Sequence, residues 1–363
     1  MEKSFYLKTF GCQMNVADSQ RITHSFIEKG YKPAKTAKKA NLVIIVSCMV
    51  RESAENRIYG LINNLQKQGI KKIILTGCLA GCLLNDRLPK LYKNLIRSKT
   101  KGVKIVAVDD LASFNIPPVR TNDTAWVPIS NGCNNFCSYC IVPFARNKEI
   151  SRPIRDIIEE VKQSLSDGFK NITLLGQNVN SYGSDLVKNK KQKNITMIKS
   201  MGKRRIPSLF PYLLNKVAKI DGVDRLDFMS SNPWDFSNNL IKVIADNKNI
   251  TKTLHLPIQS GDDNILKLMN RNYTGKEYLK LINKIRKAIP EVEFTTDIIV
   301  GFPGESKKQF ENTINLCKKI GFRKAYISRY SPRYGTAASK FKDDVSPKEK
   351  KRRWLELENL INH

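Results

Sequence analysis

Short apolar runs alternate with helical segments along most of the chain, and this alternation restricts the fold to the α/β class. In the first third, the runs at 5–10, 42–46 and 73–76 are separated by helical segments at 18–29 and 51–68. Strands that alternate with helices form parallel sheets, in which the carboxyl ends of all strands lie at the same edge. The sequence therefore predicts an N-terminal domain built on a parallel sheet.

Six further strand-like runs follow, with helical segments in the gaps between them. They lie at 126–129, 172–175, 225–229, 253–257, 294–300 and 325–329. Six strand-helix units predict a partial (β/α)6 barrel, a relative of the eightfold barrel, in which the active site is expected at the carboxyl ends of the strands.

The segment at 115–123 is polar and contains two prolines, so it reads as a linker. We therefore expect an N-terminal domain over residues 1–118, a barrel domain over 119–345 and a final helix over 346–363. A chain of 363 residues is long enough for two such cores.

The charge balance favours a polyanionic partner. Lys and Arg number 63 against 33 Asp and Glu, a formal net charge of +30, which favours nucleic acid through counterion release. A lysine-rich overall composition explains the same excess equally well. The segment Lys188 to Arg205 carries eight basic residues and no acidic one, and such a block predicts a mobile loop.

The sequence also restricts the compartment. No apolar run approaches the roughly 20 residues that span a bilayer, and residues 1–10 lack the pattern of a secretory signal. We expect a soluble cytoplasmic protein without a membrane partner. The eight cysteines are then thiols or metal ligands, because a reducing compartment disfavours disulfides.

Cys133, Cys137 and Cys140 form a C-x3-C-x2-C cluster with no fourth cysteine or histidine nearby. Structural zinc requires four closed ligands, and ferredoxin-type clusters use four thiolates. Three thiolates in one tight loop instead suit an iron-sulfur cluster that leaves one iron open to another ligand.

Three other cysteines, Cys12, Cys48 and Cys78, each follow one of the first three strand-like runs. They should converge at the carboxyl edge of the parallel sheet, where ligands of open α/β sheets bind, so a second metal-thiolate centre is predicted. Each cysteine alone could equally be a small core residue. Cys82 breaks the pattern and is a bystander or a substitute ligand, whereas Cys317 follows helical spacing and is predicted to be core.

Polar residues directly follow several barrel strands, at 176–178, 230–232 and 259–261. Helix capping and turns explain Ser, Asn and Gly there, but they explain Gln177 and Gln259 poorly. Asp297 lies within a strand, and a carboxylate inside a barrel needs a partner, which a polar substrate or an arginine could supply.

The cysteine cluster with Tyr139 before its last cysteine resembles the radical S-adenosylmethionine superfamily. Over most of the chain, the sequence is similar to the methylthiotransferases of that superfamily, and in particular to the MiaB family. The segments that carry this resemblance are 8–15, 51–57, 76–80, 140–146, 174–182, 255–261 and 297–305.

The resemblance implies two 4Fe-4S clusters and S-adenosylmethionine. Cys133, Cys137 and Cys140 would bind the radical-generating cluster, whose open iron is chelated by the methionine part of S-adenosylmethionine. Cys12, Cys48 and Cys78 would bind an auxiliary cluster that carries sulfur. The residues expected to contact S-adenosylmethionine are Tyr139, Gly176, Gln177, Ser230 and Gln259.

The implied activity is that of a radical tRNA methylthiotransferase. It would insert sulfur and a methyl group at carbon 2 of N(6)-isopentenyladenosine at position 37, next to the anticodon. The implied partners are the tRNA anticodon loop and an electron donor of the flavodoxin or ferredoxin type, and a monomer is expected. Family members usually continue into a C-terminal TRAM domain that helps to bind RNA, and we expect no such domain within the 363 residues.

Two alternatives remain open. Related methylthiotransferases act on threonylcarbamoyladenosine in tRNA or on an aspartate of a ribosomal protein, although the segment 176–182 favours the MiaB branch. A protein of another class, a non-catalytic RNA-binding protein with structural metal, would also account for cysteines and basic charge.

Overall fold

The computed structural model describes residues 3–50, 52–120, 123–189, 193–200 and 205–363. By its internal contacts the chain forms two compact units. Unit 1 comprises residues 1–134 and 140–169, and unit 2 comprises 135–139 and 170–363. The division of the sequence into domains at residues 118 and 345 stays a prediction.

Unit 1 contains the predicted parallel sheet. Its strands follow the order β2-β1-β3-β4-β5, and every neighbouring pair is parallel. The strands are β1 (Ser4–Thr9), β2 (Lys32–Pro33), β3 (Leu42–Ser47), β4 (Ile73–Gly77) and β5 (Lys104–Ile105). This confirms the α/β class and the N-terminal parallel sheet.

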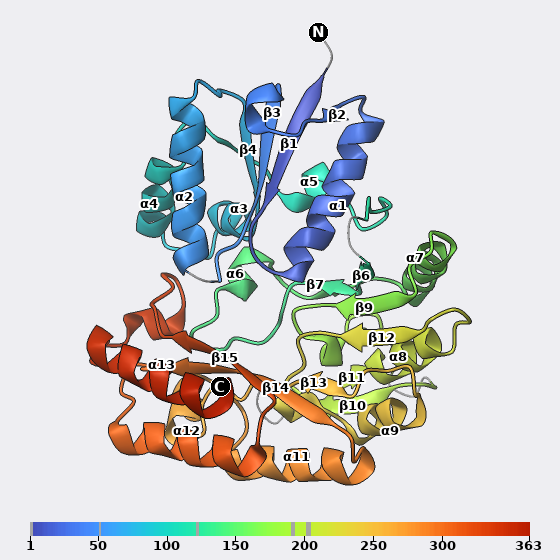
Figure 1. Cartoon of the computed structure of the whole chain (residues 1–363), viewed down its shortest axis with the longest axis vertical. Helices are drawn as coiled ribbons and strands as arrows, with labels where there is room; N and C mark the ends of the chain where they lie inside the picture. Colours follow the sequence, from blue (N-terminus) through green and yellow to red (C-terminus); the bar gives the residue numbers. More distant parts are fainter. Residues whose placement is uncertain (1–2, 51, 121–122, 190–192, 201–204) are drawn as a thin grey trace. The chain divides into compact units, whose positions relative to one another are not determined.

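Both faces of the sheet are covered by helices (Figure 1). On β3, Val43 and Ile45 pack against one group of buried side chains, and Ile44 and Val46 pack against another. Successive strand residues point to opposite faces, so a strand buried on both sides reads as a continuous apolar run. The flanking helices are α1 (Gln13–Glu28), α2 (Glu52–Lys67), α3 (Cys78–Leu84), α4 (Lys90–Lys99) and α5 (Val108–Leu111).

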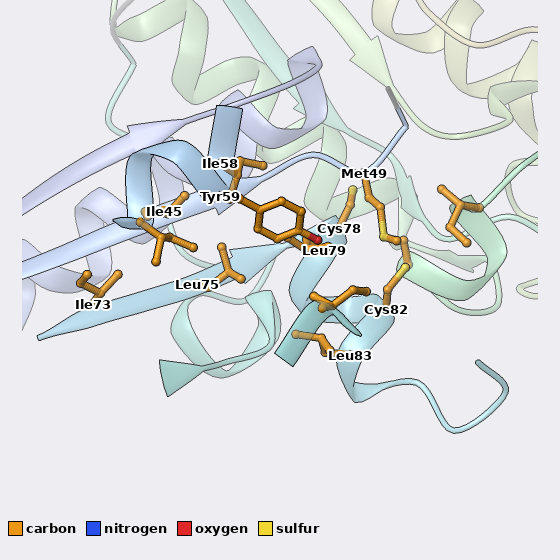
Figure 2. Close-up of a cluster of buried hydrophobic side chains, with 14 of the residues drawn as sticks. Ile45, Met49, Ile58, Tyr59, Ile73, Leu75, Cys78, Leu79, Cys82 and Leu83 are labelled. Carbon is orange, nitrogen blue, oxygen red and sulfur yellow. The ribbon is translucent and has the colours of Figure 1, made fainter. Parts of the chain in front are cut away.

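The larger of these two groups includes two cysteines of α3. Cys78 and Cys82 lie among Ile45, Met49 and Tyr59, as Figure 2 shows. Cys82 has no exposed surface, and burial raises the pKa of its thiol well above the ordinary value. Of the two interpretations given for Cys82, the apolar surroundings favour the bystander over the substitute ligand.

The rest of unit 1 is a compact segment around the start of the cysteine cluster. Its short strands β7 and β8 pair antiparallel. Gly132 follows β7 with φ +84°, and a Cβ there would lie 2.1 Å from the carbonyl oxygen of Lys148, so only glycine fits. The elements are β6 (Thr124–Pro128), β7 (Ser130–Asn131), α6 (Val142–Ala145), β8 (Ile150–Ser151) and α7 (Ile154–Ser166).

Unit 2 contains five of the six predicted barrel strands, and the sixth, β6, belongs to unit 1. β12 pairs parallel with β9, and β14 pairs parallel with both β13 and β15. A parallel bridge from Leu226 to Ile250 continues β12 toward β13. The five strands are β9 (Asn171–Leu175), β12 (Arg225–Phe228), β13 (Thr253–His255), β14 (Glu293–Val300) and β15 (Lys324–Arg329).

Helices follow these strands (Figure 1). They are α8 (Phe210–Ala218), α9 (Asn238–Asp246), α10 (Asp263–Leu268), α11 (Gly275–Ala288), α12 (Lys307–Ile320) and α13 (Pro347–Ile361). Short 3-10 helices lie at Ala37–Lys39, Val179–Ser181, Pro233–Asp235 and Ala337–Lys340. α12 begins with a capping box between Ser306 and Gln309 and ends at Gly321 in the left-handed conformation. Cys317 is buried on α12, which confirms its prediction as a core residue.

The basic segment Lys188 to Arg205 is not a loop throughout, which corrects the prediction. Its second half contains β10 (Thr196–Lys199) and the start of β11 (Arg205–Ser208), which pair antiparallel. Ile198 is buried, so its apolar side chain orders the strand despite the surrounding charge. Residues 190–192 and 201–204 of the segment lie outside the described residues.

In the part of the chain that the structure describes, no helix combines the length and the hydropathy that crossing a bilayer requires.

Candidate functional site: two thiol sets and the polar ends of the barrel strands

The structure brings Cys12, Cys48 and Cys78 together at the carboxyl edge of the unit 1 sheet. Cys12 caps α1 after β1, Cys48 directly follows β3, and Cys78 directly follows β4. Cys78 interacts electrostatically with both other thiols. The packing is close, since a Cβ on Gly11 would lie 2.6 Å from that of Cys48. The convergence inferred from the strand ends is therefore present, and metal binding by these thiols stays a prediction.

A buried arginine accompanies these thiols. Arg146 donates hydrogen bonds of 2.7 Å each to Asn15 Oδ1 and Asp18 Oδ2, and Asn15 Oδ1 lies 3.8 Å from Cys78 Sγ. Burial opposes the charge of Arg146, but Asp18, Cys78 and Cys12 raise its pKa above the ordinary value. A permanent positive charge thus lies beside the thiols, as an anionic thiolate cluster would need.

In the absence of a metal, the buried Cys78 thiol holds its proton near neutral pH. Burial raises the pKa of its thiol to about 11, although Arg146 opposes this shift. A metal must therefore replace a proton at this sulfur. Within the described residues, no three His, Cys, Asp or Glu side chains are grouped as ligands of one ion would be. Cysteines that bind different irons of one cluster do not need that spacing.

The C-x3-C-x2-C cysteines lie in one loop that follows β7. In unit 1, Cys133 is buried and its N–H donates to the carbonyl oxygen of Asn147 at 3.2 Å. In unit 2, Cys137 is half-buried, and its neighbour Ser138 bonds to the carbonyl oxygens of Leu268 and Met269. The loop is thus anchored by backbone contacts on both sides of its apex.

Arg271 lies beside Cys137 and was missed by the sequence analysis. Its Nη1 is 3.7 Å from Cys137 Sγ and 3.0 Å from Asn232 Oδ1, and its Nη2 donates to the carbonyl oxygen of Pro257 at 2.8 Å. The guanidinium carbon lies 4.6 Å from the ring centroid of Trp234. Within the described residues Arg271 has no carboxylate at ion-pair distance, so a thiolate at Cys137 is a suitable counter-charge.

Three of the residues expected to contact S-adenosylmethionine have a strained backbone or an unpaired polar atom. Ser230 and Gln259 adopt positive φ of 72° and 66°, which is uncommon outside glycine and clusters at functional sites. The side-chain oxygens of Gln177 and Gln259 are buried, and no described residue donates to them. Buried acceptors without donors suit a polar ligand. These residues therefore fit an amino-acid cofactor, and their contact with it stays a prediction.

The two other residues of that prediction lie in ordinary surroundings. Gly176 is buried directly after β9. Tyr139 packs against the buried cluster that contains Met269, Phe302 and Tyr330. The aromatic residue before the last cysteine therefore ties the loop to the unit 2 core.

A buried carboxyl group follows β12 and was also missed. Asp235 accepts hydrogen bonds from Asn178 Nδ2 at 2.8 Å and from Asn180 Nδ2 at 2.6 Å. Burial raises the pKa of Asp235 to about 7, and the two amides oppose that shift. Asp235 is thus a structural partner of the segment 176–182. The local sequence around Asp235 contains no pattern that predicts this contact.

Asp297 finds a partner different from those expected. Its Oδ2 lies 3.2 Å from Nε2 of His255 on β13, and Nδ1 of the same ring lies 3.0 Å from Thr295 Oγ1. No described arginine pairs with Asp297, and the other expected partner, a polar substrate, stays a prediction. Parallel register places Thr295 directly opposite His255, and Asp297 is the next residue on the same face of β14.

Comparison with known proteins identifies the class. The model of the radical SAM superfamily matches residues 127–317, and that of the uncharacterized protein family UPF0004 matches residues 4–95. The radical S-adenosylmethionine methyltransferase TsrM from Kitasatospora setae superposes with a TM-score of 0.58 over 93% of this chain and 77% of its own, at 10% identity. The radical enzyme OxsB superposes with a TM-score of 0.54 over 98% and 55%, at 7% identity. The fold and the site thus define a radical S-adenosylmethionine protein.

Curated relatives identify the family. A protein of Bacillus licheniformis is 38% identical over 99% of this chain and 72% of its own length, and one of Thermotoga petrophila is 39% identical over 98% and 81%. A third, from Carboxydothermus hydrogenoformans, is 39% identical over 99% and 84%. All three are named tRNA-2-methylthio-N(6)-dimethylallyladenosine synthase. The chain belongs to this family.

Proposed function

We propose that this chain is a tRNA methylthiotransferase that inserts sulfur and a methyl group at carbon 2 of N(6)-isopentenyladenosine, at position 37 beside the anticodon. The observation that carries the proposal is the convergence of Cys12, Cys48 and Cys78 beside Arg146, in a chain that also carries the C-x3-C-x2-C loop. A radical enzyme needs only the loop, whereas sulfur insertion needs a second place to hold sulfur.

In this proposal each thiol set holds one 4Fe-4S cluster. Cys133, Cys137 and Cys140 would hold the first, and Cys12, Cys48 and Cys78 the auxiliary one. When bound, the first cluster and S-adenosylmethionine supply the one-electron chemistry that activates a carbon-hydrogen bond, which protein side chains cannot perform. The protein contributes binding, orientation and charge.

The residues of the chain divide that task. Gln177 and Gln259 offer buried acceptors for the cofactor's ammonium group, and the left-handed backbone at Gln259 fixes where its amide lies. Arg271 would balance the thiolate at Cys137, and Arg146 those of the auxiliary set. The target adenine has to leave its stack to reach such residues.

The remaining parts of the proposal concern partners. An electron donor of the flavodoxin or ferredoxin type would reduce the first cluster, and the protein would act as a cytoplasmic monomer. A related activity on threonylcarbamoyladenosine is the second candidate, since the same two thiol sets would serve it. The names of the relatives favour the isopentenylated substrate.

Nucleoside mass spectrometry tests the proposal. A bacterial strain that lacks its own enzyme and expresses this chain should regain 2-methylthio-N(6)-isopentenyladenosine in its tRNA. Recovery of the threonylcarbamoyl product would move the assignment to the second candidate. A protein that restores neither product and cleaves no S-adenosylmethionine after anaerobic reconstitution would contradict the proposal.

A further inference from the structure

A polar pocket of about 630 Å³ lies within unit 2, and of its lining residues only Asp235 and Trp234 belong to the candidate site described above. Its lining residues come from the hairpin of β10 and β11, the 3-10 helix Pro233–Asp235, the start of α9 and the part of α11 up to Lys284. Figure 1 labels the strands and α-helices among these elements. Four basic side chains line it, two from the hairpin and two from α11: Lys199, Arg205, Lys280 and Lys284. The volume exceeds what a single small ion needs.

The four basic residues form two pairs of like charge. Lys199 lies directly opposite Arg205 in the antiparallel hairpin, and like charges in that position destabilise a strand pair. Lys280 and Lys284 are one turn apart on α11, where like charges are again unfavourable. Both pairs line the same pocket, so an anion bound there would relieve both repulsions.

The acidic residues of the pocket are already engaged. Asp235 accepts hydrogen bonds from two buried amides, and burial raises its pKa to about 7, so its negative charge is reduced near neutrality. Glu277 forms the capping box of α11 with Thr274. Neither carboxylate pairs with the pocket cations, so no described residue neutralises Lys199, Arg205 or Lys280.

Aromatic side chains form part of the pocket wall. Trp234 and Tyr273 stack with ring centroids 6.0 Å apart and are both buried, whereas Met197 on β10 is 38% exposed. Asn239 Nδ2 donates to Thr196 Oγ1 at 3.0 Å and joins α9 to the hairpin. A positively charged groove is one of the features by which proteins hold the backbone of single-stranded nucleic acid.

We infer that this pocket binds the phosphodiester backbone of unpaired RNA, as a contact separate from the residues that receive the reacting base. The inference rests on the proposed function, because it takes tRNA as the substrate. Lys199 and Arg205 grip phosphates from the hairpin, and Lys280 grips them from α11.

The test compares two triple variants that lose the same charge. The pocket variant carries Lys199→Gln, Arg205→Gln and Lys280→Gln, all at exposed positions. Lys284 is kept because its Nζ donates to Asn238 at 2.5 Å and helps to hold α9. The control carries Lys248→Gln, Lys307→Gln and Lys318→Gln, which are exposed on unit 2 and do not line the pocket.

Fluorescence anisotropy with a labelled RNA anticodon stem-loop measures the dissociation constant over a series of KCl concentrations. The pocket variant should bind about tenfold more weakly, and its salt slope should be less steep by about 0.7 for each lost contact with unpaired RNA. The control variant should have a dissociation constant and a salt slope close to those of the unmodified protein. Equal behaviour of the two variants would overturn the inference.

Two further outcomes separate this inference from the proposed function and from a free-nucleotide site. If the unmodified chain binds RNA through these residues yet restores no methylthio nucleoside, the proposed function fails and the inference stands. If modification is restored while the pocket variant binds RNA normally, the inference fails alone. If the pocket variant loses only the binding of AMP or inorganic phosphate, the pocket is a free-nucleotide site and the inference is wrong.

Discussion

Two buried arginines lie beside cysteines of the two thiol sets. Arg146 accompanies Cys78 in unit 1, and Arg271 lies 3.7 Å from Cys137 in unit 2. A buried guanidinium is costly unless it is paired and hydrogen-bonded, and here carbonyl and amide oxygens supply much of that pairing. Each arginine stabilises an anionic form of the neighbouring sulfur, which is what metal binding requires.

The first prediction concerns Arg271. Arg271→Gln should lower the reduction potential of the cluster at Cys133, Cys137 and Cys140 by on the order of tens of millivolts, because a nearby positive charge favours the more negative reduced state. A redox titration followed by electron paramagnetic resonance measures this shift.

Arg271→Lys is the matched control, since it keeps the positive charge. Its cluster should have a reduction potential close to that of the unmodified protein. If the Gln and Lys variants give the same potential as the unmodified protein at full iron content, Arg271 has only a structural role.

The second prediction concerns Asp235. An unfolded aspartate titrates near pH 4, whereas burial raises the pKa of Asp235 to about 7, so between these values only the native state holds the proton. The free energy of unfolding therefore falls as pH rises through this window. Asp235→Asn removes that dependence. From pH 5 to pH 8, the unmodified protein should lose about 2–3 kcal/mol relative to the variant, measured by urea unfolding. If the difference in unfolding free energy between the unmodified protein and the variant stayed constant from pH 5 to pH 8, Asp235 would not titrate in this range.

Among the elements, α7 carries the most concentrated charge network of unit 1. Glu160 on α7 binds Arg21 of α1 at 2.8 Å, Arg152 after β8 at 2.7 Å and Arg120 before β6 at 3.1 Å. Burial alone would raise the pKa of Glu160, but the three guanidinium groups lower it below the usual value. Its stabilising contribution is thus present above the pKa of the unfolded carboxyl and is lost as pH falls through the native pKa.

The third prediction compares neighbours on this helix. Glu160→Gln should destabilise unit 1 by about 3–5 kcal/mol, because it removes the carboxylate that pairs with three buried guanidinium groups. Glu159→Gln removes an exposed pair with Arg155 and should cost less than about 0.5 kcal/mol.

Thermal unfolding of the two α7 variants measures this difference as a difference in melting temperature. The difference should become smaller in acid, where Glu160 is protonated. Equal melting temperatures at neutral pH would mean that the network contributes no net stability.

At the scale of the whole molecule, the proposed chemistry depends on two thiol sets of different construction. One is a single loop of eight residues, from Cys133 to Cys140, and the other is assembled from Cys12, Cys48 and Cys78, which are far apart in sequence. The first set could serve many radical reactions. The second set makes sulfur insertion the specific proposal.

The fourth prediction separates the two sets. Cys12→Ala, Cys48→Ala or Cys78→Ala should retain reductive cleavage of S-adenosylmethionine and abolish methylthiolation, and iron should fall from about eight to about four per chain. Cys82→Ala, one turn after Cys78 on α3, should retain both activities because Cys82 packs in the core. Iron analysis and product assays measure the outcome. Loss of cofactor cleavage in the Cys78 variant, with Cys82 variants unaffected, would contradict a separate auxiliary site.

The sequence by itself determined the elements and the position of the cysteines along them. Short apolar runs and strand-helix alternation predicted every strand of the parallel sheet that is followed by one of these cysteines. Strand polarity then required Cys12, Cys48 and Cys78 to share one edge. These are local signals combined with one topological rule, so they can be read without coordinates.

Only the tertiary structure decided which charges are buried and what they meet. Arg146 reaches Asp18 across 128 positions, Arg271 reaches Cys137 across 134, and Asp297 pairs with His255 rather than with an arginine. The pocket at β10 and β11 likewise joins the hairpin to α11, which begins some 70 residues later. Such contacts depend on burial and on desolvation energy, which are properties of the packed fold and leave no periodic trace in the sequence.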